Sequence, residues 1–478
     1  MQEARQFYIN GAWVAPLEGT PLDVLNPSNE EPFATITLGG QADTDAAVAA
    51  AKAAFPAWSM TSKAERLAAL ERLAAAYDAR AEDMAQAISH EMGAPIALAR
   101  HSQVAAGSGH FQNTIKSLKE FDFEWALGDH APGARILMEP IGVCALITPW
   151  NWPMNQVVLK VAPALAAGCT VVLKPSEVAP LSSCIFAEIV DAADIPAGVF
   201  NLVNGDGPGV GSQLSVHPDV DMVSFTGSTR AGKLITKAAA DSIKRVTLEL
   251  GGKGANIIFA DADEKAVTRG VRHCFNNSGQ SCNAPTRMLV ERKLYDQAVE
   301  TAKAVAEQTE VAAADIDGRQ IGPVVSDVQW EKIQGLIQTG IDEGARLIAG
   351  GTGRPEGLNR GYFTRPTIFA DVDAEMTVWR EEIFGPVLAM TPFDSEDQAI
   401  EMANDTAYGL TNYVQTQDVE KARRSARALR SGMVEINGKS RGPGAPFGGY
   451  RQSGNGREGG TWGLEDFLEV KSVGGWDL

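Results

Sequence analysis

Apolar positions change their spacing partway along the chain. From Asp43 to about Ala105 they recur at helical intervals, as at Leu67, Leu70 and Leu73, and we expect helices that end near Gly107. Beyond this stretch, short apolar runs of strand length alternate with segments long enough for helices. The predicted strands of this first series are Arg135 to Glu139, Val143 to Ile147, Thr170 to Leu173, Phe200 to Val203 and Met222 to Phe225.

A second series of strands begins after Glu249. Helices fit between several of them, as at Leu294 to Glu307 and Asp327 to Glu343. Such alternation predicts an α/β fold with two doubly wound parallel-sheet domains, divided near Gly251-Gly252. The strands of the second series are Ala255 to Phe259, Thr286 to Val290, Arg346 to Ala349, Val387 to Thr391, Tyr413 to Gln415 and Met433 to Ile436.

Composition narrows the class of protein. The 478 residues are 44% apolar and 21% charged, which is typical of a soluble protein with more than one core. A net charge of −18 disfavours nucleic acid and anionic membranes as partners, and the apolar runs are too short for a membrane span. Five cysteines without paired spacing and no apparent signal peptide favour the cytoplasm. Six scattered histidines predict no metal site.

Cys282 and Glu249 are the candidate nucleophile and general base. Cys282 lies among small and polar residues, which are poor core material and suit an exposed thiol; the alternative is a small buried hydrophobe. Glu249 ends an alternating run before two glycines, where partial burial would raise its pKa toward that of a base; the alternative is a solvated edge residue. A dyad with His273 stays open, whereas His217 suits a surface turn.

Asn151 is the candidate oxyanion donor. It lies in Thr148-Pro149-Trp150-Asn151-Trp152-Pro153, a stiff segment after a predicted strand. Its side-chain N–H and the backbone N–H of Cys282 could together hold the oxygen of a tetrahedral intermediate. A purely structural turn is the alternative.

Three segments indicate a nucleotide. Lys174 ends a strand, and Glu177 three residues later could accept from both ribose hydroxyls and repel a 2′-phosphate, which favours NAD over NADP. Phe225 to Gly232 resembles a strand, tight turn and helix start that present N–H groups to a phosphate, and Gly205 to Gly209 is a second glycine-rich loop. Neither loop is G-x-G-x-x-G, and ordinary glycine-rich turns are the alternative.

These motifs together resemble the NAD(P)-dependent aldehyde dehydrogenase superfamily, from about Tyr8 to Val473. The matching segments are Pro149 to Pro153, Lys174 to Glu177, Phe225 to Ser228, Glu249 to Lys253, Gly279 to Cys282, Glu381 to Val387, Pro446 to Tyr450 and Ser453 to Glu458.

The resemblance implies Cys282 as nucleophile, Glu249 as base and Asn151 as oxyanion donor. It implies a Rossmann-like cofactor domain in which Lys174 and Glu177 bind the adenosine ribose and Ser228 the pyrophosphate. Glu382 would bind the nicotinamide ribose, with Phe384 beside the ring. The expected cofactor contacts also include Ile147, Thr148, Pro149, Trp150, Ser176, Gly207, Thr226, Gly227 and Leu250.

The implied reaction oxidises a small-molecule aldehyde with NAD⁺. Cys282 forms a thiohemiacetal, a hydride leaves to NAD⁺, and water activated by Glu249 hydrolyses the thioester to a carboxylic acid. Glu249 argues against a coenzyme A-acylating semialdehyde dehydrogenase, since those relatives commonly lack it. The intact trio argues against a silent binding or structural protein on the same fold.

A semialdehyde or an aromatic aldehyde is the expected substrate. Trp152 suggests an apolar wall, Gln156 and Leu159 follow along a predicted helix, and Ser281 flanks the nucleophile. The loop Asn437 to Pro443, before Phe447, falls where the family's substrate entrance lies. Its Arg441 or Lys439 could pair with a substrate carboxylate; the alternative is that both face solvent.

The resemblance also implies a small oligomerisation element. Residues 1–122 and 142–250 would form the NAD-binding domain and 251–452 the catalytic domain. Residues 123–141 and 453–478 would form a β arm and tail that assemble homodimers or homotetramers, with Arg135 to Glu139 a poorly covered strand awaiting a partner.

Overall fold

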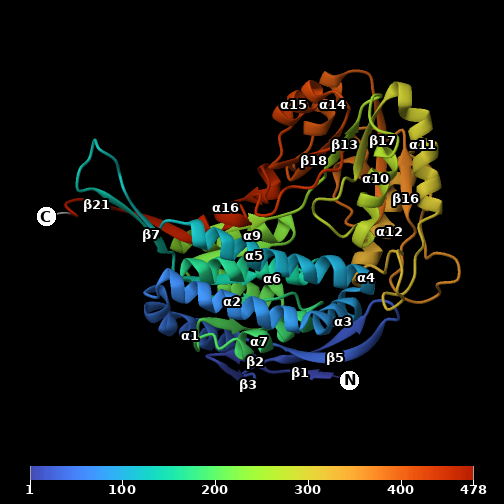
Figure 1. The fold of residues 1–478 in the computed structure, drawn as a ribbon. Helices are drawn as coiled ribbons and strands as arrows, with labels where there is room; N and C mark the ends of the chain where they lie inside the picture. The colour runs from blue at the N-terminus through green and yellow to red at the C-terminus, as the bar shows by residue number, and fades with distance from the viewer. Residues whose placement is uncertain (1, 477–478) are drawn as a thin grey trace.

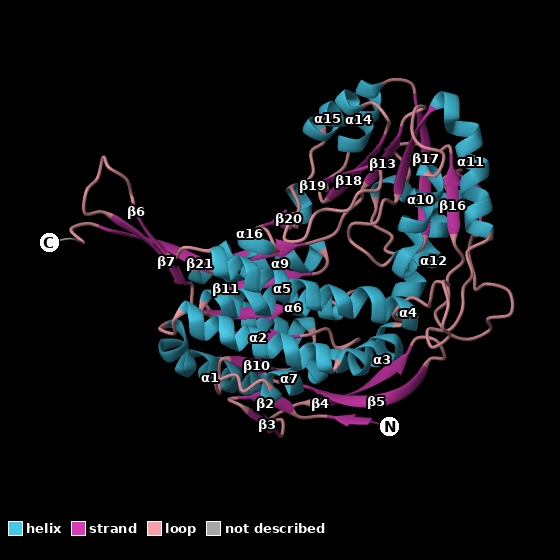
Figure 2. Ribbon diagram, in the orientation of Figure 1, coloured by secondary structure: helices cyan, strands magenta, loops and turns pink. Residues whose placement is uncertain are grey.

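Two large sheets and two small ones organise residues 2–476, the part of the chain that the computed structural model describes (Figures 1 and 2). The first large sheet has the order β20-β12-β11-β8-β9-β10-β2-β3, and its five central strands, β12 to β10, are parallel. Its strands are β2 (Phe7–Ile9), β3 (Ala12–Val14), β8 (Val143–Ile147), β9 (Thr170–Lys174), β10 (Phe200–Leu202), β11 (Met222–Thr226), β12 (Arg245–Glu249) and β20 (Gly454–Asn455).

Strand β8 shows why its sequence is continuously apolar. Val143, Ala145 and Ile147 pack into the hydrophobic cluster shared with α1, whereas Cys144 and Leu146 pack into the cluster shared with α6. Because successive side chains of a strand point to opposite faces, a strand covered by helices on both faces needs apolar residues throughout. The sheet is therefore doubly wound, as expected.

The second large sheet has the order β15-β16-β17-β14-β13-β18-β19, and only β15 is antiparallel to its neighbour. It also separates two hydrophobic clusters, with Ile257 and Leu289 in one and Ile258 and Met288 in the other. Its strands are β13 (Ala255–Ile258), β14 (Arg287–Glu291), β15 (Arg346–Ala349), β16 (Thr367–Ala370), β17 (Val387–Phe393), β18 (Thr411–Gln415) and β19 (Met433–Ile436).

The helices cover these sheets. With the first sheet lie α1 (Gln41–Ser59), α2 (Lys63–Ala79), α3 (Ala81–Met92), α4 (Ile96–Leu98), α5 (Ala105–Glu120), α6 (Pro153–Ala167), α7 (Leu181–Ala192), α8 (Ser212–Val216), α9 (Thr229–Ala239) and α16 (Gly460–Glu465). With the second lie α10 (Ala266–Phe275), α11 (Arg292–Glu307), α12 (Asp327–Asp342), α13 (Thr377–Arg380), α14 (Glu396–Asn404) and α15 (Val419–Ala428).

The predicted strands of both series are confirmed within a residue or two, but the predicted end of the helical region near Gly107 is wrong. Gly107 lies inside α5, which continues to Glu120. A Cβ at this position would lie 2.2 Å from the hydroxyl oxygen of Tyr77 on α2. The glycine therefore permits close packing of two helices and does not end one.

The third sheet, of order β21-β7-β6, forms an arm that projects from the body (Figure 1). Its strands are β6 (Glu124–Ala126), β7 (Arg135–Pro140) and β21 (Leu468–Val473). Both edges of β7 are paired, so this strand has no free edge for a partner, while its residues remain half-exposed. Strand β20, from the C-terminal region, pairs with β12 in the first large sheet.

The fourth sheet, of order β1-β5-β4, and the short strands β2 and β3 were not anticipated from the sequence. Its strands are β1 (Gln2–Ala4), β4 (Thr20–Asn26) and β5 (Glu31–Leu38).

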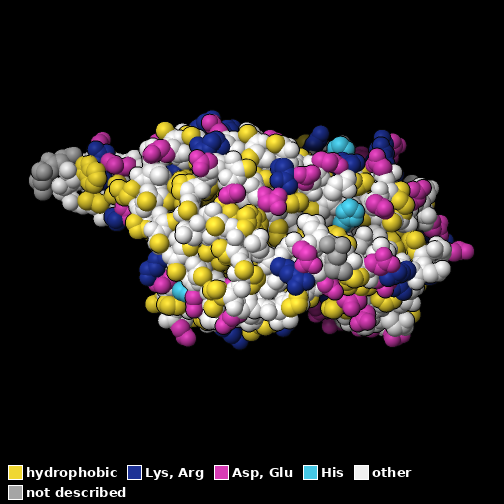
Figure 3. All heavy atoms as spheres, turned by 90° about the horizontal axis from the view of Figure 1, so that it is seen from below, with side chains coloured by type: hydrophobic (Ala, Val, Ile, Leu, Met, Phe, Trp, Pro, Cys, Tyr) yellow, Lys and Arg dark blue, Asp and Glu magenta, His cyan; other side chains and the backbone are white. Residues whose placement is uncertain are grey.

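On the face shown in Figure 3, basic and acidic side chains are interspersed.

Within residues 2–476, no helix is long and apolar enough to cross a membrane.

Glu91, near the end of α3, holds the buried N-terminus of α7. Its carboxylate accepts hydrogen bonds from the backbone N–H groups of Leu181 (2.5 Å) and Ser182 (3.0 Å) and from the Ser182 hydroxyl (2.6 Å). The first N–H groups of a helix lack partners within the helix, so this carboxylate replaces water that cannot enter.

We predict that Glu91→Ala lowers the free energy of unfolding by about 1–3 kcal/mol, because it leaves buried donors unpaired. Urea denaturation measures this. Glu188→Ala on α7 is the matched control, since its ion pair with Arg80 is exposed and contributes about 0–1 kcal/mol. Equal losses in the two variants would contradict the role given to Glu91.

Candidate active site

The candidate site lies where the strand order of the first sheet reverses. The chain runs β8, β9, β10 in one direction and then returns to β11 and β12 on the other side of β8. Ligands of doubly wound sheets bind beyond the carboxyl ends of the strands at such a point. Asn151 follows β8, Ser228 follows β11, and Glu249 is the last residue of β12.

Cys282 enters this region on a strained loop from the second sheet's domain. Three consecutive residues before it have left-handed backbone conformations: Asn277 (φ 53°), Ser278 (φ 58°) and Gly279 (φ 74°). A Cβ on Gly279 would lie 2.0 Å from the carbonyl oxygen of Gly385, so only glycine fits there.

Buried amides hold this loop against the first domain. The Asn277 side chain donates to the backbone carbonyl of Asn151 at 2.9 Å and accepts from Gln103 at 3.1 Å. The Gln280 side chain accepts from the backbone N–H of Val325 at 2.9 Å. Because each of these groups is buried, breaking one bond would leave an unpaired polar atom.

The Asn151 side chain points toward the same loop. It is 4% exposed, its amide nitrogen donates to the carbonyl of Gln280 at 3.0 Å, and it shares a cavity with Cys282. The structure thus brings the predicted oxyanion donor beside the predicted nucleophile.

Glu249 is buried, and both of its carboxylate oxygens lack a hydrogen-bond partner. Burial, reinforced by repulsion from the nearby carboxylate of Glu458, raises the pKa of Glu249 well above its usual range. A carboxylate in this state is a stronger base than an exposed one, and it faces the same cavity as Cys282.

Burial also raises the pKa of the Cys282 thiol, with further contributions from Glu382 and Glu249. With these neighbours alone, the thiol is protonated at neutral pH. Cys282 is nevertheless partly accessible, whereas the other four cysteines are buried.

Two cavities meet at Cys282. The first cavity, of about 200 Å³, is lined by the three candidate catalytic residues Asn151, Glu249 and Cys282. Glu382 enters it and accepts a hydrogen bond from the backbone N–H of Gly252 at 2.8 Å, while the rings of Phe384 and Trp150 lie edge to face at 5.5 Å. The expected cofactor contacts that line it are Pro149, Trp150, Thr226, Gly227, Ser228, Leu250, Glu382 and Phe384.

The remaining expected cofactor contacts, Ile147, Thr148, Lys174, Ser176, Glu177 and Gly207, do not line this cavity. They lie at the carboxyl ends of β8 and β9 and in the glycine-rich loop after β10. Lys174 links these segments, since its ammonium donates to the carbonyls of Pro175 and Gly205 and lies 3.4 Å from Glu177. The segment Lys174 to Glu177 and the loop Gly205 to Gly209, both predicted for a nucleotide, are therefore neighbours.

The second cavity, of about 290 Å³, opens on the other side of Cys282. Trp152 lines it and donates to the Ser281 hydroxyl at 2.9 Å. Gln156 lines it as well; its side-chain oxygen is buried without a partner. Phe447 completes the apolar wall.

Arg441 lines the second cavity, but its charge is already paired. Its guanidinium lies over the ring of Phe447 at 4.9 Å from the centroid and 3.5 Å from the carboxylate of Glu435, which is largely buried. Lys439 does not line the cavity. A substrate carboxylate would therefore have to compete with Glu435.

Sequence reasoning missed a buried ion pair behind Glu249. The ammonium of Lys160 donates to Glu458 at 2.5 Å and to the Ser224 hydroxyl at 3.0 Å. The i, i+4 spacing of Gln156 and Lys160 on one helix was the available signal for Lys160. Nothing local in the sequence places Glu458 beside it.

His273 packs its ring edge-on against Tyr413 at 5.0 Å, and no hydrogen bond joins it to Cys282. Among residues 2–476, no group of three or more His, Cys, Asp or Glu side chains is arranged to hold a metal ion.

The fold and this cysteine site define a class that comparison with known proteins identifies: the chain belongs to the aldehyde dehydrogenase family, whose pattern it matches over residues 13–473. It is 52% identical to a 3-succinoylsemialdehyde-pyridine dehydrogenase of a Pseudomonas species, over the full length of both chains.

Solved structures agree. An aldehyde dehydrogenase from Bartonella henselae is 59% identical, with a TM-score of 0.98 over 99% of both chains. A cysteine-to-alanine variant of aldehyde dehydrogenase C from Pseudomonas syringae, in complex with NAD⁺ and octanal, is 49% identical, with a TM-score of 0.97 over 99% of this chain and 97% of that one.

We predict that Glu382→Gln speeds alkylation of Cys282 by iodoacetamide at neutral pH. Removing the Glu382 charge lowers the pKa of the thiol, so more thiolate is present at any pH below that pKa. Rates measured across pH 7–10 should show the profile shifted to lower pH. Glu381→Gln, at the exposed neighbouring position, is the control and should leave the profile in place.

Proposed function

We propose that this protein oxidises an aldehyde to a carboxylic acid with NAD⁺, using water as the acyl acceptor. The observation that carries the proposal is the position of Cys282 between two cavities. One cavity is lined by Asn151, Glu249 and eight of the fourteen expected cofactor contacts, and the other provides a separate space for a substrate.

The residues present fit NAD⁺. The aromatic wall of Trp150 and Phe384 and the carboxylate of Glu382 suit a nicotinamide riboside, and Gly251 leaves room that a Cβ would fill against Glu382. Glu177, partly exposed beside Lys174, suits ribose hydroxyls and opposes a 2′-phosphate, so NADP is the weaker candidate. The NAD⁺ complex of the related Pseudomonas syringae enzyme supports this choice.

Bound NAD⁺ supplies the hydride acceptor. The Cys282 thiol gives its proton to solvent, its thiolate attacks the aldehyde carbon, and Asn151 with the backbone N–H of Cys282 stabilises the oxyanion that forms. After the hydride has left, Glu249 takes a proton from water, which attacks the thioester and releases the acid. The buried pair of Lys160 and Glu458 tunes the pKa of Glu249.

For the substrate, we infer a neutral semialdehyde or aromatic aldehyde with a second carbonyl group. The ion pair of Arg441 with Glu435 offsets the positive charge that a substrate carboxylate would need, whereas Gln156 lines the same cavity with an uncharged amide whose N–H can donate to a carbonyl. The related Pseudomonas enzyme is named for a succinoyl semialdehyde carried on a pyridine ring, a substrate of this chemistry.

We further propose a homodimer or homotetramer located in the cytoplasm. The arm of β6, β7 and β21 exposes apolar side chains, such as Trp125 and Val470, that a second copy could cover. We propose the same domain division as from the sequence. The NAD-binding domain comprises residues 1–122 and 142–250, and the catalytic domain comprises residues 251–452. The arm and the C-terminal tail comprise residues 123–141 and 453–478.

We predict that Glu249→Gln gives a burst of about one NADH per active site, followed by a steady rate lower by about 10²–10⁴-fold, because thioester hydrolysis loses its base. Stopped-flow absorbance at 340 nm measures both phases. Cys282→Ala should give no burst, and Glu381→Gln should behave as wild type. A slow first turnover without a burst would place Glu249 before thioester formation and contradict the assignment.

We predict that Gln156→Leu raises the KM for 4-oxo-4-phenylbutanal by about 2- to 10-fold, the cost of one hydrogen bond, and does not raise it for octanal. In wild type, succinate semialdehyde should be the poorest of the three because its carboxylate meets the Arg441–Glu435 pair. Steady-state NADH formation measures all three. Preference for succinate semialdehyde in wild type would overturn the neutral-substrate proposal.

A further inference from the structure

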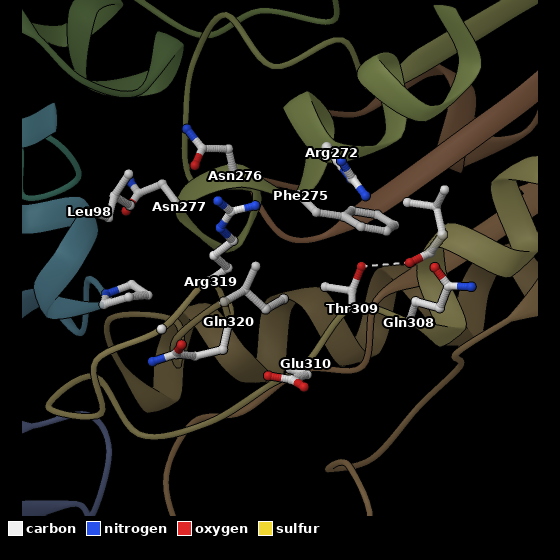
Figure 4. Close-up of a pocket in the computed structure, with 14 residues that line it drawn as sticks. Leu98, Arg272, Phe275, Asn276, Asn277, Gln308, Thr309, Glu310, Arg319 and Gln320 are labelled. Carbon is white, nitrogen blue, oxygen red and sulfur yellow. Dashed lines mark hydrogen bonds between the residues drawn. The ribbon is translucent and has the colours of Figure 1, made fainter. Parts of the chain in front are cut away.

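A third cavity, of about 720 Å³, lies away from both cavities at Cys282 (Figure 4). It is formed by the end of α10, the end of α11 with the loop that follows, and Leu98 of α4. It shares no residue with the two cavities already described. Neither the reaction nor the cofactor accounts for it.

Three charged residues line this cavity: Arg272, Arg319 and Glu310. Arg272 comes from α10, and Arg319 reaches from the loop on the opposite wall toward Asn276 and Asn277 (Figure 4). Within residues 2–476, neither guanidinium has an ion pair or a hydrogen bond, although most arginines of this part of the chain do. Against the single carboxylate of Glu310, the lining carries one net positive charge.

The rest of the lining is suited to a small organic molecule. Apolar side chains, among them Leu98, Phe275 and Ile321, face the same space, and Figure 4 shows the Phe275 ring between Arg272 and Thr309. An apolar wall beside two exposed, unpaired guanidiniums suits an anion that also carries a hydrophobic group. One net charge matches a monoanion, and the planar fork of Arg matches a carboxylate.

Two walls of this cavity continue into the loop that carries Cys282. Asn276 and Asn277 form one wall, and the Asn277 side chain holds the Asn151 carbonyl. The opposite wall ends at Ile321, and the next residue, Gly322, accepts a hydrogen bond from the Ser278 hydroxyl at 2.7 Å. Asn277 and Ser278 are the two left-handed, strained residues, so their positions depend on these neighbours.

We propose that this cavity binds an organic monocarboxylate with an apolar group, held by Arg272 and Arg319, and that binding restrains the Cys282 loop. Such a ligand joins the two walls that position Asn277 and Ser278. Occupancy therefore lowers the reactivity of Cys282 without entering either active-site cavity.

Calorimetric titration of the full chain with benzoate tests the binding. Wild type should bind, and Arg319→Gln and Arg272→Gln should each weaken binding about tenfold, the loss expected for one charge-assisted hydrogen bond. Arg427→Gln is the matched control, since Arg427 is also exposed and unpaired but lies on α15. Both arginines of the cavity are exposed, so these variants should keep the wild-type melting temperature.

Absence of binding to wild type, or equal binding to all variants, would overturn the site. Tighter binding of inorganic phosphate with the same arginine dependence would overturn the choice of a carboxylate. The coupling is tested by alkylation of Cys282 with iodoacetamide: benzoate at about three times the wild-type Kd should slow the reaction at least about 1.5-fold in wild type and Arg427→Gln, and clearly less in Arg319→Gln, where most sites are then empty. An unchanged rate in wild type would overturn the coupling. Neither measurement needs an aldehyde or NAD⁺, so failure of the proposed reaction would leave both results readable.

Discussion

The chemistry of this molecule depends on one constrained loop. Asn277, Ser278 and Gly279 all lie in the left-handed region, which costs about 1–3 kcal/mol for each non-glycine residue. Such a conformation persists only where several contacts with the surrounding structure hold it in place. Here buried amides from Gln103 and Asn277 and the hydroxyl of Ser278 do so, and the two amides join the two domains beside the Cys282 thiol.

Electrostatics at this point follow from the same burial. Cys282, Glu249 and Glu382 lie close together in a poorly solvated space, and each has a raised pKa because its charged form is disfavoured there. Each negative charge in this space therefore makes the next one more costly. A positively charged ligand in the first cavity would shift all three toward their charged forms, which links occupancy of that cavity to readiness of the thiol and of the base.

Much of this arrangement could be predicted from the sequence, since short apolar runs bounded by turn residues determine the strands and the residues at their ends. Cys282, Glu249 and Asn151 could be proposed as candidates because each lies in a short, distinctive segment, and the structure brings them to one cavity. Other features depend on contacts between distant residues. Gly107 looked like a helix end because its role is set by Tyr77, thirty positions earlier. The pairing of Lys160 with Glu458 joins residues 298 positions apart, and no local pattern marks it.

Arg441 shows that substrate specificity is also hard to predict from the sequence. From the sequence, a cation in an entrance loop suggests a site for an anionic substrate, but the meaning of a charge depends on what else reaches it. Glu435 ends up 3.5 Å away because the loop after β19 folds back over the strand, and Phe447 supplies the opposite face of the guanidinium. An arginine held in this way forms a flat part of the wall whose charge is offset by Glu435. Under the proposed substrate class, selectivity in the second cavity would depend on the uncharged amide of Gln156, which discriminates by hydrogen bonding and not by charge.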